Sequence, residues 1–374
     1  MTGPHAEFTD SNMDPSGVAS PDAGSLAAGG LSCPAPAPDG DRVLLGHGSG
    51  GKLSARLIRD RFLPRFANEA LAPLGDGAVV ALGSERFAIS TDTFVVSPLE
   101  FPGGDIGLLA VHGTLNDVAM MGAEAICLSS GFVLEEGLPL AILDRILDSM
   151  ARAAAEAGVP LVTGDTKVVE RGKADGLYLN TTGIGRLREG FEPGPDRARP
   201  GDSVIVSGAI GRHGIAVMSV REGLGFEVEV ESDTAHLGPL VEALRDACGE
   251  EVRALRDPTR GGVASALNEI AASSRVGIAL EGSALPVPDP VHAACEVLGL
   301  DPLYVANEGI LIAIVGPESE DAALRALRGH PTGAGAEKIG QVEAAPVGMV
   351  TLRTGLGGSR VVDMLPGDQL PRIC

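Results

Sequence analysis

The chain has 374 residues, of which 44% are hydrophobic and 21% charged, and this length allows about two ordinary domains. Its 29 basic and 50 acidic residues give a formal net charge of −21, which repels nucleic-acid backbones and anionic lipid. No run approaches the roughly 20 apolar residues of a membrane helix. Composition thus argues against nucleic acid and membrane as partners, and a bound nucleotide would need metal ions or backbone N–H groups to offset its charge.

The cysteines are few, odd in number and widely separated, and no CxxC pair occurs. This pattern argues against a zinc ribbon and a thioredoxin-like site, and it is typical of a reducing cytoplasm. Residues 1–41 are rich in Gly, Pro, Ala, Ser and Asp, and their composition predicts a disordered tail. The first Lys or Arg is Arg42 and no continuous apolar core precedes it, so the tail does not match a signal peptide.

A β-hairpin is the first strong prediction along the chain, after a short strand expected at 42–45. Residues 78–82 and 85–91 read as two strands joined by Gly83-Ser84. If Leu82 pairs with Glu85, Asp76 lies opposite Thr91 and beside Asp92. The register therefore predicts two carboxylates at the open end of the hairpin.

Helical periodicity follows over 105–122 and again from Pro139 to Gly158. The buried stripe of the second helix is predicted to comprise Leu143, Ile146, Leu147, Met150 and Ala154. A short strand at 159–163 is expected to end at Gly164-Asp165. The order of strands and helices predicts an α+β, or mixed α/β, domain.

The polar junction Arg197–Asp202 suggests a domain boundary. We therefore expect an N-terminal α/β domain at 42–196 and a C-terminal α/β domain at 197–353. The second should begin with a strand at 203–207 and include a helix near 263–272. The Gly- and Pro-containing segment 354–374 is predicted to be a flexible arm ending in Cys374.

A glycine cluster at Gly46–Lys52 has the G-x4-G-K spacing of a P-loop. Leu53 follows where a P-loop supplies a hydroxyl to magnesium, so the match favours a phosphate-contacting glycine loop of another kind. A surface loop without a ligand is the alternative.

Five aspartates fall at predicted element ends or beside Gly or Asn, where a carboxylate can face a cleft. They are Asp76, Asp92, Asp117, Asp165 and Asp257. Magnesium prefers oxygen ligands and commonly links carboxylates to nucleotide phosphates, so together they indicate a metal site. For any one of them, ordinary turn chemistry is the alternative.

Four further residues carry possible chemistry. Lys167 and Glu308 are polar residues flanked by apolar runs, which suggests inward-facing positions, although solvent-facing turns would also explain them. His112 shares a helix face with Asn116 and is left without a role. Cys374, at the end of a flexible arm, could carry a covalent group, or could be incidental.

Together these segments closely resemble the HypE family of hydrogenase maturation proteins, the carbamoyl dehydratases, collinearly from about residue 42 to 374. The matching segments are HGSGG (47–51), GDGA (75–78), TDTFVVSPLEFPGGDIG (91–107), GTLNDVAMMGA (113–123), GDTKVV (164–169), DPTRGG (257–262), NEG (307–309) and PRIC (371–374). That family is part of a superfamily with aminoimidazole ribonucleotide synthetase, selenophosphate synthetase and thiamine-monophosphate kinase. The resemblance implies a two-domain aminoimidazole ribonucleotide synthetase-like fold whose N-terminal domain dimerises through its sheet.

The resemblance also implies that ATP binds in a cleft, with Mg²⁺ on the five aspartates. Nucleotide contacts are implied at His47, Gly48, Gly50, Gly51, Thr91, Thr93, Asn116 and Gly164. The implied reaction is ATP-dependent dehydration of a carbamoyl group on Cys374 to a thiocyanate. Glu308 would be the general base and Lys167 its partner or a phosphate-charge stabiliser. The implied partners are the carbamoyltransferase HypF and the HypC–HypD scaffold, which passes cyanide to the iron of a [NiFe]-hydrogenase.

Two alternative functions stay open. A sibling small-molecule kinase or selenophosphate synthetase would share the ATP motifs, but the first has no use for Cys374. The second usually carries a Cys or selenocysteine in its glycine loop, and residues 47–52 contain none. A non-catalytic carbamoyl carrier would have no use for the aspartates and the glycine loop.

Overall fold

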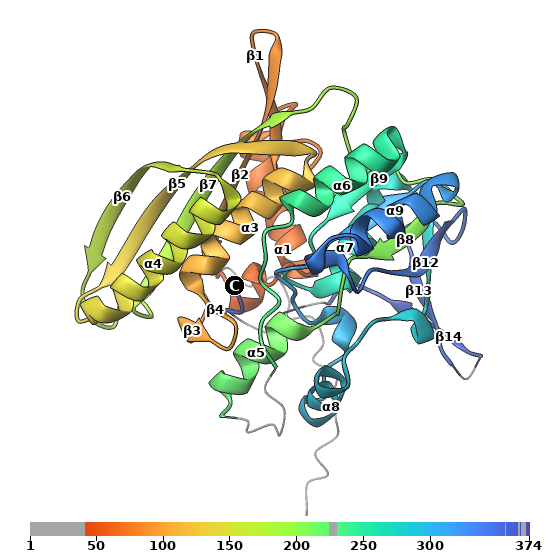
Figure 1. The fold of residues 1–374 in the computed structure, drawn as a ribbon. Coiled ribbons are helices and arrows are strands. Elements are labelled where there is room, and N and C mark those ends of the chain that lie inside the picture. The colour runs from red at the N-terminus through yellow and green to blue at the C-terminus, as the bar shows by residue number, and fades with distance from the viewer. Residues whose placement is uncertain (1–41, 224–229, 356, 366, 368–371) are drawn as a thin grey trace, which may run out of the picture. The chain divides into compact units, whose positions relative to one another are not determined.

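The structure, a computed structural model, describes residues 42–223, 230–355, 357–365, 367 and 372–374. The N-terminal tail that the sequence predicts to be disordered lies outside the described residues. Residues 42–374 form one structural unit with two large sheets and one two-stranded sheet (Figure 1). Among the described residues, no helix is both long and apolar enough to span a membrane.

The first sheet has five strands and carries two helices on one face (Figure 1). In spatial order its strands are β1 (Ala78–Leu82), β2 (Glu85–Phe94), β7 (Leu177–Leu187), β5 (Ala123–Glu135) and β6 (Leu161–Val169). Its helices are α3 (Ile106–Met120) and α4 (Leu140–Ala157), and β3 (Glu100–Phe101) pairs with β4 (Gly104–Asp105) just before α3. All pairs in the sheet are antiparallel except β5 with β6.

The predicted hairpin is confirmed in its register, because Leu82 pairs with Glu85 and Ala78 with Ile89. The first predicted helix is confirmed as α3, where the Asp105 side chain accepts the N–H of Leu108 at 2.9 Å. This N-cap bond satisfies one of the free donors at the start of the helix.

The second predicted helix is confirmed as α4, which ends at Gly158 in the left-handed conformation. Ile146 and Met150 of its predicted stripe are buried. Leu147 was predicted to be buried, and this is wrong, because its side chain is 39% exposed. Ala153, which was not part of the predicted stripe, is buried on the inner side of the helix next to Ala154.

Two other predictions for the N-terminal part of the chain need correction, and β5 was not predicted. The strand expected at 42–45 is absent from that described segment, and a single 3-10 turn begins at Leu45. The strand at 159–163 does not end at Gly164-Asp165 but continues as β6 to Val169, because its backbone pairs with β5 along that length. The sequence analysis missed β5 itself, whose Ala, Ser and Gly residues are weak strand formers.

The second sheet has seven strands with helices packed against it. In spatial order they are β14 (Ser359–Val362), β13 (Val350–Arg353), β10 (Gly277–Glu281), β12 (Glu337–Glu343), β8 (Ser203–Val206), β11 (Ile312–Val315) and β9 (Val252–Arg256). The helices of this half are α5 (Arg212–Arg221), α6 (Gly238–Cys248), α7 (Gly262–Ser274), α8 (Asp289–Leu298) and α9 (Glu320–Arg328). Both predicted elements are confirmed here, as β8 and as α7 with Val263, Leu267 and Ile270 fully buried.

Short helical segments complete the chain. Before β1 these are η1 (Leu45–Gly48), α1 (Lys52–Leu57), the π-turn η2 (Ile58–Phe62) and α2 (Leu63–Phe66). In the second half they are η3 (Gly249–Glu251), η4 (Gly282–Ala284), η5 (Pro302–Tyr304), η6 (Pro317–Ser319) and η7 (Pro331–Gly333).

The C-terminal segment is more ordered than its composition predicts. Ser359–Val362, expected to belong to a flexible arm, form β14 and pair with β13. The described chain end is also fixed, since Ile373 and Cys374 are buried in the core beneath α3. The chain thus has the predicted mixed α/β fold, with its last residue in the interior.

Candidate functional site

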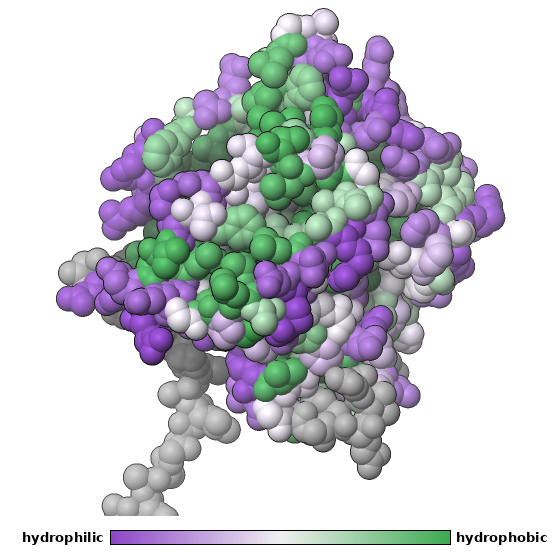
Figure 2. All heavy atoms as spheres, turned by 60° about the vertical axis from the view of Figure 1, so that its left-hand side comes forward, coloured by the Kyte–Doolittle hydropathy of each residue, from purple (hydrophilic) through white to green (hydrophobic). Residues whose placement is uncertain are grey.

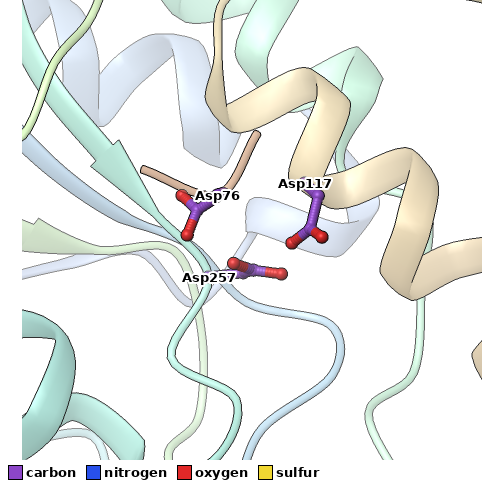
Figure 3. Close-up of side chains that lie close together, drawn as sticks. All are labelled: Asp76, Asp117 and Asp257. Carbon is purple, nitrogen blue, oxygen red and sulfur yellow. The ribbon is translucent and has the colours of Figure 1, made fainter. Parts of the chain in front are cut away.

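Three aspartates from distant parts of the sequence meet in the interior. Asp76 precedes β1, Asp117 lies on α3, and Asp257 follows β9, so each sheet or its flanking helix supplies a side chain. One carboxylate oxygen of each lies within 4.8 Å of the other two. Figure 3 shows the three carboxylates pointing toward one another. These are three of the five predicted metal ligands.

Burial and mutual repulsion disfavour the charged form of the clustered carboxyl groups. The pKa of Asp117 is raised well above its usual range by burial and by repulsion from Asp257 and Asp76. The pKa of Asp257 is raised to about 7, mainly by burial and then by Asp76. An oxygen-only set under mutual repulsion fits Mg²⁺, whose charge would offset it. These aspartates therefore suit a divalent cation, and phosphate oxygens could complete its coordination.

Arg256 supplies part of the missing positive charge. Its guanidinium pairs with Asp76 and with Glu269 on α7, and it is largely buried. Burial still raises the pKa of Asp76, but Arg256 opposes that increase. The sequence analysis did not select Arg256, although it adjoins Asp257 at the end of a buried strand.

Asp92, the fourth predicted ligand, lies near this cluster without joining its closest group. Its charge contributes to the raised pKa of both Asp117 and Asp257. Arg260 connects it to the glycine loop, because one guanidinium nitrogen lies 3.7 Å from Asp92 and the other donates to the Gly48 carbonyl at 3.2 Å. Arg260 thus faces both the acidic cluster and the loop.

The glycine loop borders a cavity of about 280 Å³ beside the aspartates. Its walls include His47, Gly48, Gly50, Asp76 and Asp257. Gly50 has a φ of +75°, which favours glycine, and its N–H donates to the Ser54 hydroxyl at 3.0 Å. A Cβ on Gly51 would lie 2.5 Å from the Leu365 carbonyl oxygen, so glycine permits the close packing of this loop on the C-terminal segment.

Cys374 and Glu308, both predicted catalytic residues, lie together in the interior. Burial raises the pKa of the Cys374 thiol and of the Glu308 carboxyl group well above their usual range, and the nearby Glu308 raises that of Cys374 further. One Glu308 oxygen has no hydrogen-bond partner within the described chain. Arg260 opposes the increase at both groups. The last residue of the chain therefore lies in the interior close to Glu308.

The end of the arm is held by backbone bonds on both sides. The N–H of Val95, just after β2, donates to the Cys374 backbone oxygen at 3.2 Å, and that of Ser97 donates to the Arg372 carbonyl at 3.3 Å. The Arg221 guanidinium also donates to the Arg372 carbonyl, at 2.6 Å. These contacts extend the edge of the first sheet and place Cys374 beside Glu308. Pro371, the first residue of the PRIC segment, lies outside the described residues.

Four predicted residues lie on the sheet face opposite α3 and α4. Side chains alternate along β2, so Thr91 and Thr93 face away from Asp92, and in the register Asp165 shares a row with Thr93. Three strand spacings separate β2 from β6, roughly 14 Å at 4.7–4.9 Å each. Asp165 pairs with Lys167 at 2.7 Å, and both side chains are at least 70% exposed. Neither residue reaches the acidic cluster of its own subunit.

Asn116 and Gly164 were also predicted to contact the nucleotide. In the structure both residues make contacts between elements of the fold. The Asn116 amide donates to the Ala235 carbonyl at 3.0 Å and accepts the Leu237 N–H at 2.8 Å. Gly164 allows β6 to approach β5, because a Cβ would lie 2.4 Å from the Ser130 oxygen. Neither contact is with the glycine loop or the aspartates. Thr91 and Thr93 likewise bond across the sheet, to Thr182 and Asn180.

The sequence analysis missed the segment 230–237, which we call the strap. Besides Asn116, the strap contacts Glu308, whose N–H donates to the Asp233 carboxylate at 3.2 Å. Its Ser232 hydroxyl bonds His213 of α5 at 2.9 Å. The only sequence signal was the short run of small polar residues Ser232-Asp233-Thr234, which is also typical of a loop.

Comparisons with known proteins agree with this architecture. Residues 74–187 match the family "AIR synthase related protein, N-terminal domain", and residues 199–353 match its C-terminal domain. Carbamoyl dehydratase HypE of Rhizobium leguminosarum bv. viciae is 53% identical over 333 residues, 89% of this chain and 95% of that protein. HypE of Escherichia coli K12 is 45% identical over 340 residues, 89% of this chain and 100% of that protein.

Solved structures give the same result. The hydrogenase maturation protein HypE in complex with ATP is 51% identical, with a TM-score of 0.75 over 89% of this chain and 100% of that one. A HypE–HypF complex contains a chain that is 47% identical, with a TM-score of 0.79 over 83% of this chain and 99% of that one. At these identities and coverages, the chain belongs to the carbamoyl dehydratase HypE family, within the AIR synthase related proteins.

Proposed function

We propose that this chain is an ATP-dependent carbamoyl dehydratase of hydrogenase maturation, which converts a carbamoyl group on Cys374 to a thiocyanate. One observation carries the proposal: the terminal thiol is enclosed beside Glu308, near a cavity bordered by aspartates and a glycine loop. One oxygen of the Glu308 carboxyl group has no hydrogen-bond partner among the described residues. A kinase site has no use for an enclosed thiol of its own. The relatives at 45–53% identity are carbamoyl dehydratases, which supports the same function.

The reaction has two steps. The carbamoyl oxygen of the Cys374 S-carbamoyl group attacks the terminal phosphate of ATP, which releases ADP and converts the oxygen into a phosphate leaving group. The C–O bond then breaks, phosphate departs, and the nitrogen loses both of its protons over the two steps to leave S–C≡N. The sum is the loss of one water from the carbamoyl group, driven by conversion of ATP to ADP and phosphate.

Glu308 is positioned to accept a proton from the carbamoyl nitrogen. Its carboxyl group lies close enough to the Cys374 thiol, which would carry the carbamoyl group, to raise the pKa of that thiol. Burial raises its pKa, and a base with a raised pKa binds a proton more strongly. Arg260 faces the same region, and its fixed charge would stabilise negative charge that develops on the phosphate oxygens.

Asp76, Asp117 and Asp257 would hold Mg²⁺, with Asp92 close by. When bound, the ion would offset phosphate charge in a protein whose formal net charge is −21. The glycine loop borders the same cavity, and a phosphate can approach its backbone closely because side chains are absent. A HypE relative has been solved in complex with ATP, which supports nucleotide binding here.

The carbamoyl donor would be a HypF transferase, since a relative of this chain forms a complex with HypF. The thiocyanate would pass to a HypC–HypD scaffold on the way to the [NiFe]-hydrogenase iron. We place these steps in the cytoplasm, where a thiol carrier stays reduced. Four described cysteines, Cys374 among them, are free.

We further propose that the protein is a homodimer whose first sheets pack face to face. Ile89, Val133 and Ile184 lie on the same face of this sheet as Asp165 and Lys167, and each is only partly buried. Figure 2 shows hydrophobic residues gathered on the side of the molecule that carries β6 and α4. A second copy would cover this surface and bring Asp165 and Lys167 to the partner's site. That arrangement would restore the roles that the resemblance implies for them.

The test is intact mass spectrometry after incubation with HypF, carbamoyl phosphate and ATP. We expect a carbamoyl adduct on Cys374 that loses the mass of one water only when Mg²⁺ and ATP are present. An adduct that never loses water would favour the carrier function. ATP consumption on an added small molecule, with Cys374 unmodified, would favour a kinase-like sibling. Glu308→Gln should stop the reaction at the carbamoyl adduct.

A further inference from the structure

We propose that His213 is a positioning residue that latches the C-terminal arm in its closed state during dehydration, an inference that rests on the proposed function. His213 lies on α5 and is fully buried. Its Nε2 is 2.9 Å from the carbonyl oxygen of Ile373, the residue before Cys374. A side chain of the second half thus contacts the arm one peptide unit from the reacting sulfur.

The two hydrogen bonds of the ring fix its tautomer. A carbonyl oxygen can only accept, so Nε2 carries the hydrogen and donates to Ile373. Nδ1 is then an acceptor and takes the hydroxyl hydrogen of Ser232 at 2.9 Å. Ser232 belongs to the strap, whose next residue, Asp233, accepts the N–H of Glu308. The strap therefore contacts both the His213 ring and the backbone of Glu308, the proposed base.

The surroundings of the ring keep it neutral and immobile. The edge of Phe101 packs against it with ring centroids 5.4 Å apart. Burial lowers the pKa of His213 to about 4, so the ring is neutral near pH 7 and Nδ1 remains an acceptor. A ring with both nitrogens bonded and one packed face has little freedom to release Ile373 while the arm is closed.

The latch matters because Cys374 must occupy two places. It must reach the transferase to be loaded, and it must then lie against Glu308. Other contacts of the chain end use Val95, Ser97 and Arg221, and the Arg372 side chain pairs with Asp175. Without His213 the Ile373 carbonyl would be buried with no donor, and an unsatisfied buried acceptor is costly. Loss of this bond should therefore shift the arm toward the open state.

The first readout is alkylation of Cys374 by iodoacetamide, quantified on the C-terminal peptide. His213→Ala should raise the rate about tenfold over wild type, because the arm opens more often. His213→Gln should stay within about twofold, since its amide can donate to Ile373 from the position of Nε2. His292→Ala, an exposed histidine on α8, is the matched control and should leave the rate unchanged.

The second readout is single-turnover dehydration of protein that already carries the carbamoyl group. His213→Ala should slow it about tenfold while carbamoylation by HypF proceeds at least as fast as in wild type, and His213→Gln should recover most of the rate. A purely structural role would impair both steps together. If His213→Ala does not fold, Ser232→Ala, which keeps the ring and removes its orienting donor, should accelerate alkylation of Cys374.

Equal alkylation and dehydration rates in wild type, His213→Ala and Ser232→Ala would overturn the latch. The alkylation assay needs neither ATP nor HypF, so it separates failure of the latch from failure of the proposed function. The carbamoyl group on wild-type Cys374 could fail to lose water while His213 still protects Cys374 from alkylation. That result would support the latch and disprove the proposed reaction.

Discussion

At the scale of single residues, the three clustered aspartates place a requirement on the protein that a cation would meet. Their carboxyl groups bind protons more tightly in the folded state than in the unfolded chain, because burial and repulsion raise their pKa values. The metal-free protein must therefore lose stability as the pH rises from about 4 through the raised pKa values. The clustered carboxyl groups thus lower the stability of the metal-free protein above their raised pKa values and provide the ligands for a cation.

Asp117→Asn should make the metal-free protein more stable at pH 8 by a few degrees in Tm. The amide can keep the contact with the Ser90 hydroxyl but removes one buried charge. The same substitution should reduce Mg²⁺-dependent ATP turnover at least tenfold and abolish most of the Tm increase caused by Mg²⁺. Thermal unfolding with and without Mg²⁺ measures both effects. Asp144→Asn, at an exposed position of α4, is the control, and a lower Tm of metal-free Asp117→Asn would contradict the charge argument.

His213 makes an opposite contribution to the pH dependence of stability. Its folded-state pKa of about 4 lies below the ordinary value of 6.5, so the unfolded chain binds more protons between these values. The contribution is present above pH 6.5 and is lost as the pH falls toward 4. At 1.36 kcal/mol per pKa unit, the full loss is about 3 kcal/mol.

Denaturant unfolding of wild type and His213→Gln between pH 7.5 and 4 isolates this term, since other groups titrate in both proteins. The stability of wild type relative to the variant should fall by about 3 kcal/mol across the range. His292→Gln provides the comparison for an exposed histidine. A difference that does not change with pH would mean that His213 is already charged, or accessible to solvent, in the folded protein.

At the scale of elements, the strap determines where the NEG loop lies. Gly309 follows Glu308, and its N–H donates to the Asp233 carboxylate at 3.2 Å. A Cβ on Gly309 would lie 1.6 Å from the Asp233 carbonyl oxygen, which no real contact permits. The glycine of this motif is thus explained by backbone packing, independently of any role in chemistry.

Gly309→Ala should therefore displace the loop and lower dehydration by at least tenfold, with a loss of stability of roughly 1–3 kcal/mol from overpacking. Gly355→Ala is the matched control, because a Cβ there meets nothing within 4 Å. Single-turnover dehydration and denaturant unfolding of both variants provide the measurement. Wild-type activity in Gly309→Ala would show that the strap and the loop can separate without loss of function.

Local patterns predicted those elements that local interactions determine. The hairpin register followed from a two-residue turn, and α3 from the helical spacing of its apolar residues. The full length of β6 did not follow, because Gly164 and Asp165 are typical turn residues and only pairing with β5 keeps them extended. His213 and Asp233 were missed for the same reason: their partners, Ile373 and Glu308, are 160 and 75 residues away.

At the scale of the whole molecule, the two faces of the first sheet carry different groups of residues. The face toward α3 carries Asp92 and packs into the core, whereas the other carries Thr93, Asp165 and Lys167. If a partner subunit packs on that second face, each site would combine Glu308 from one chain with Lys167 from the other. Mixed dimers can test this, because the two substitutions then fall in different sites.

One subunit would carry Lys167→Ala and the other Glu308→Ala, each inactive as a homodimer. In a mixed dimer with shared sites, one site keeps both wild-type residues and the other loses both, so the isolated heterodimer should show about half of wild-type dehydration. Sites built within single chains would leave the heterodimer inactive, since each would lack one residue. A Glu308→Ala subunit paired with a Cys374→Ala subunit is the control. If the arm stays in its own subunit, as the proximity of Cys374 to Glu308 indicates, that heterodimer should have no activity.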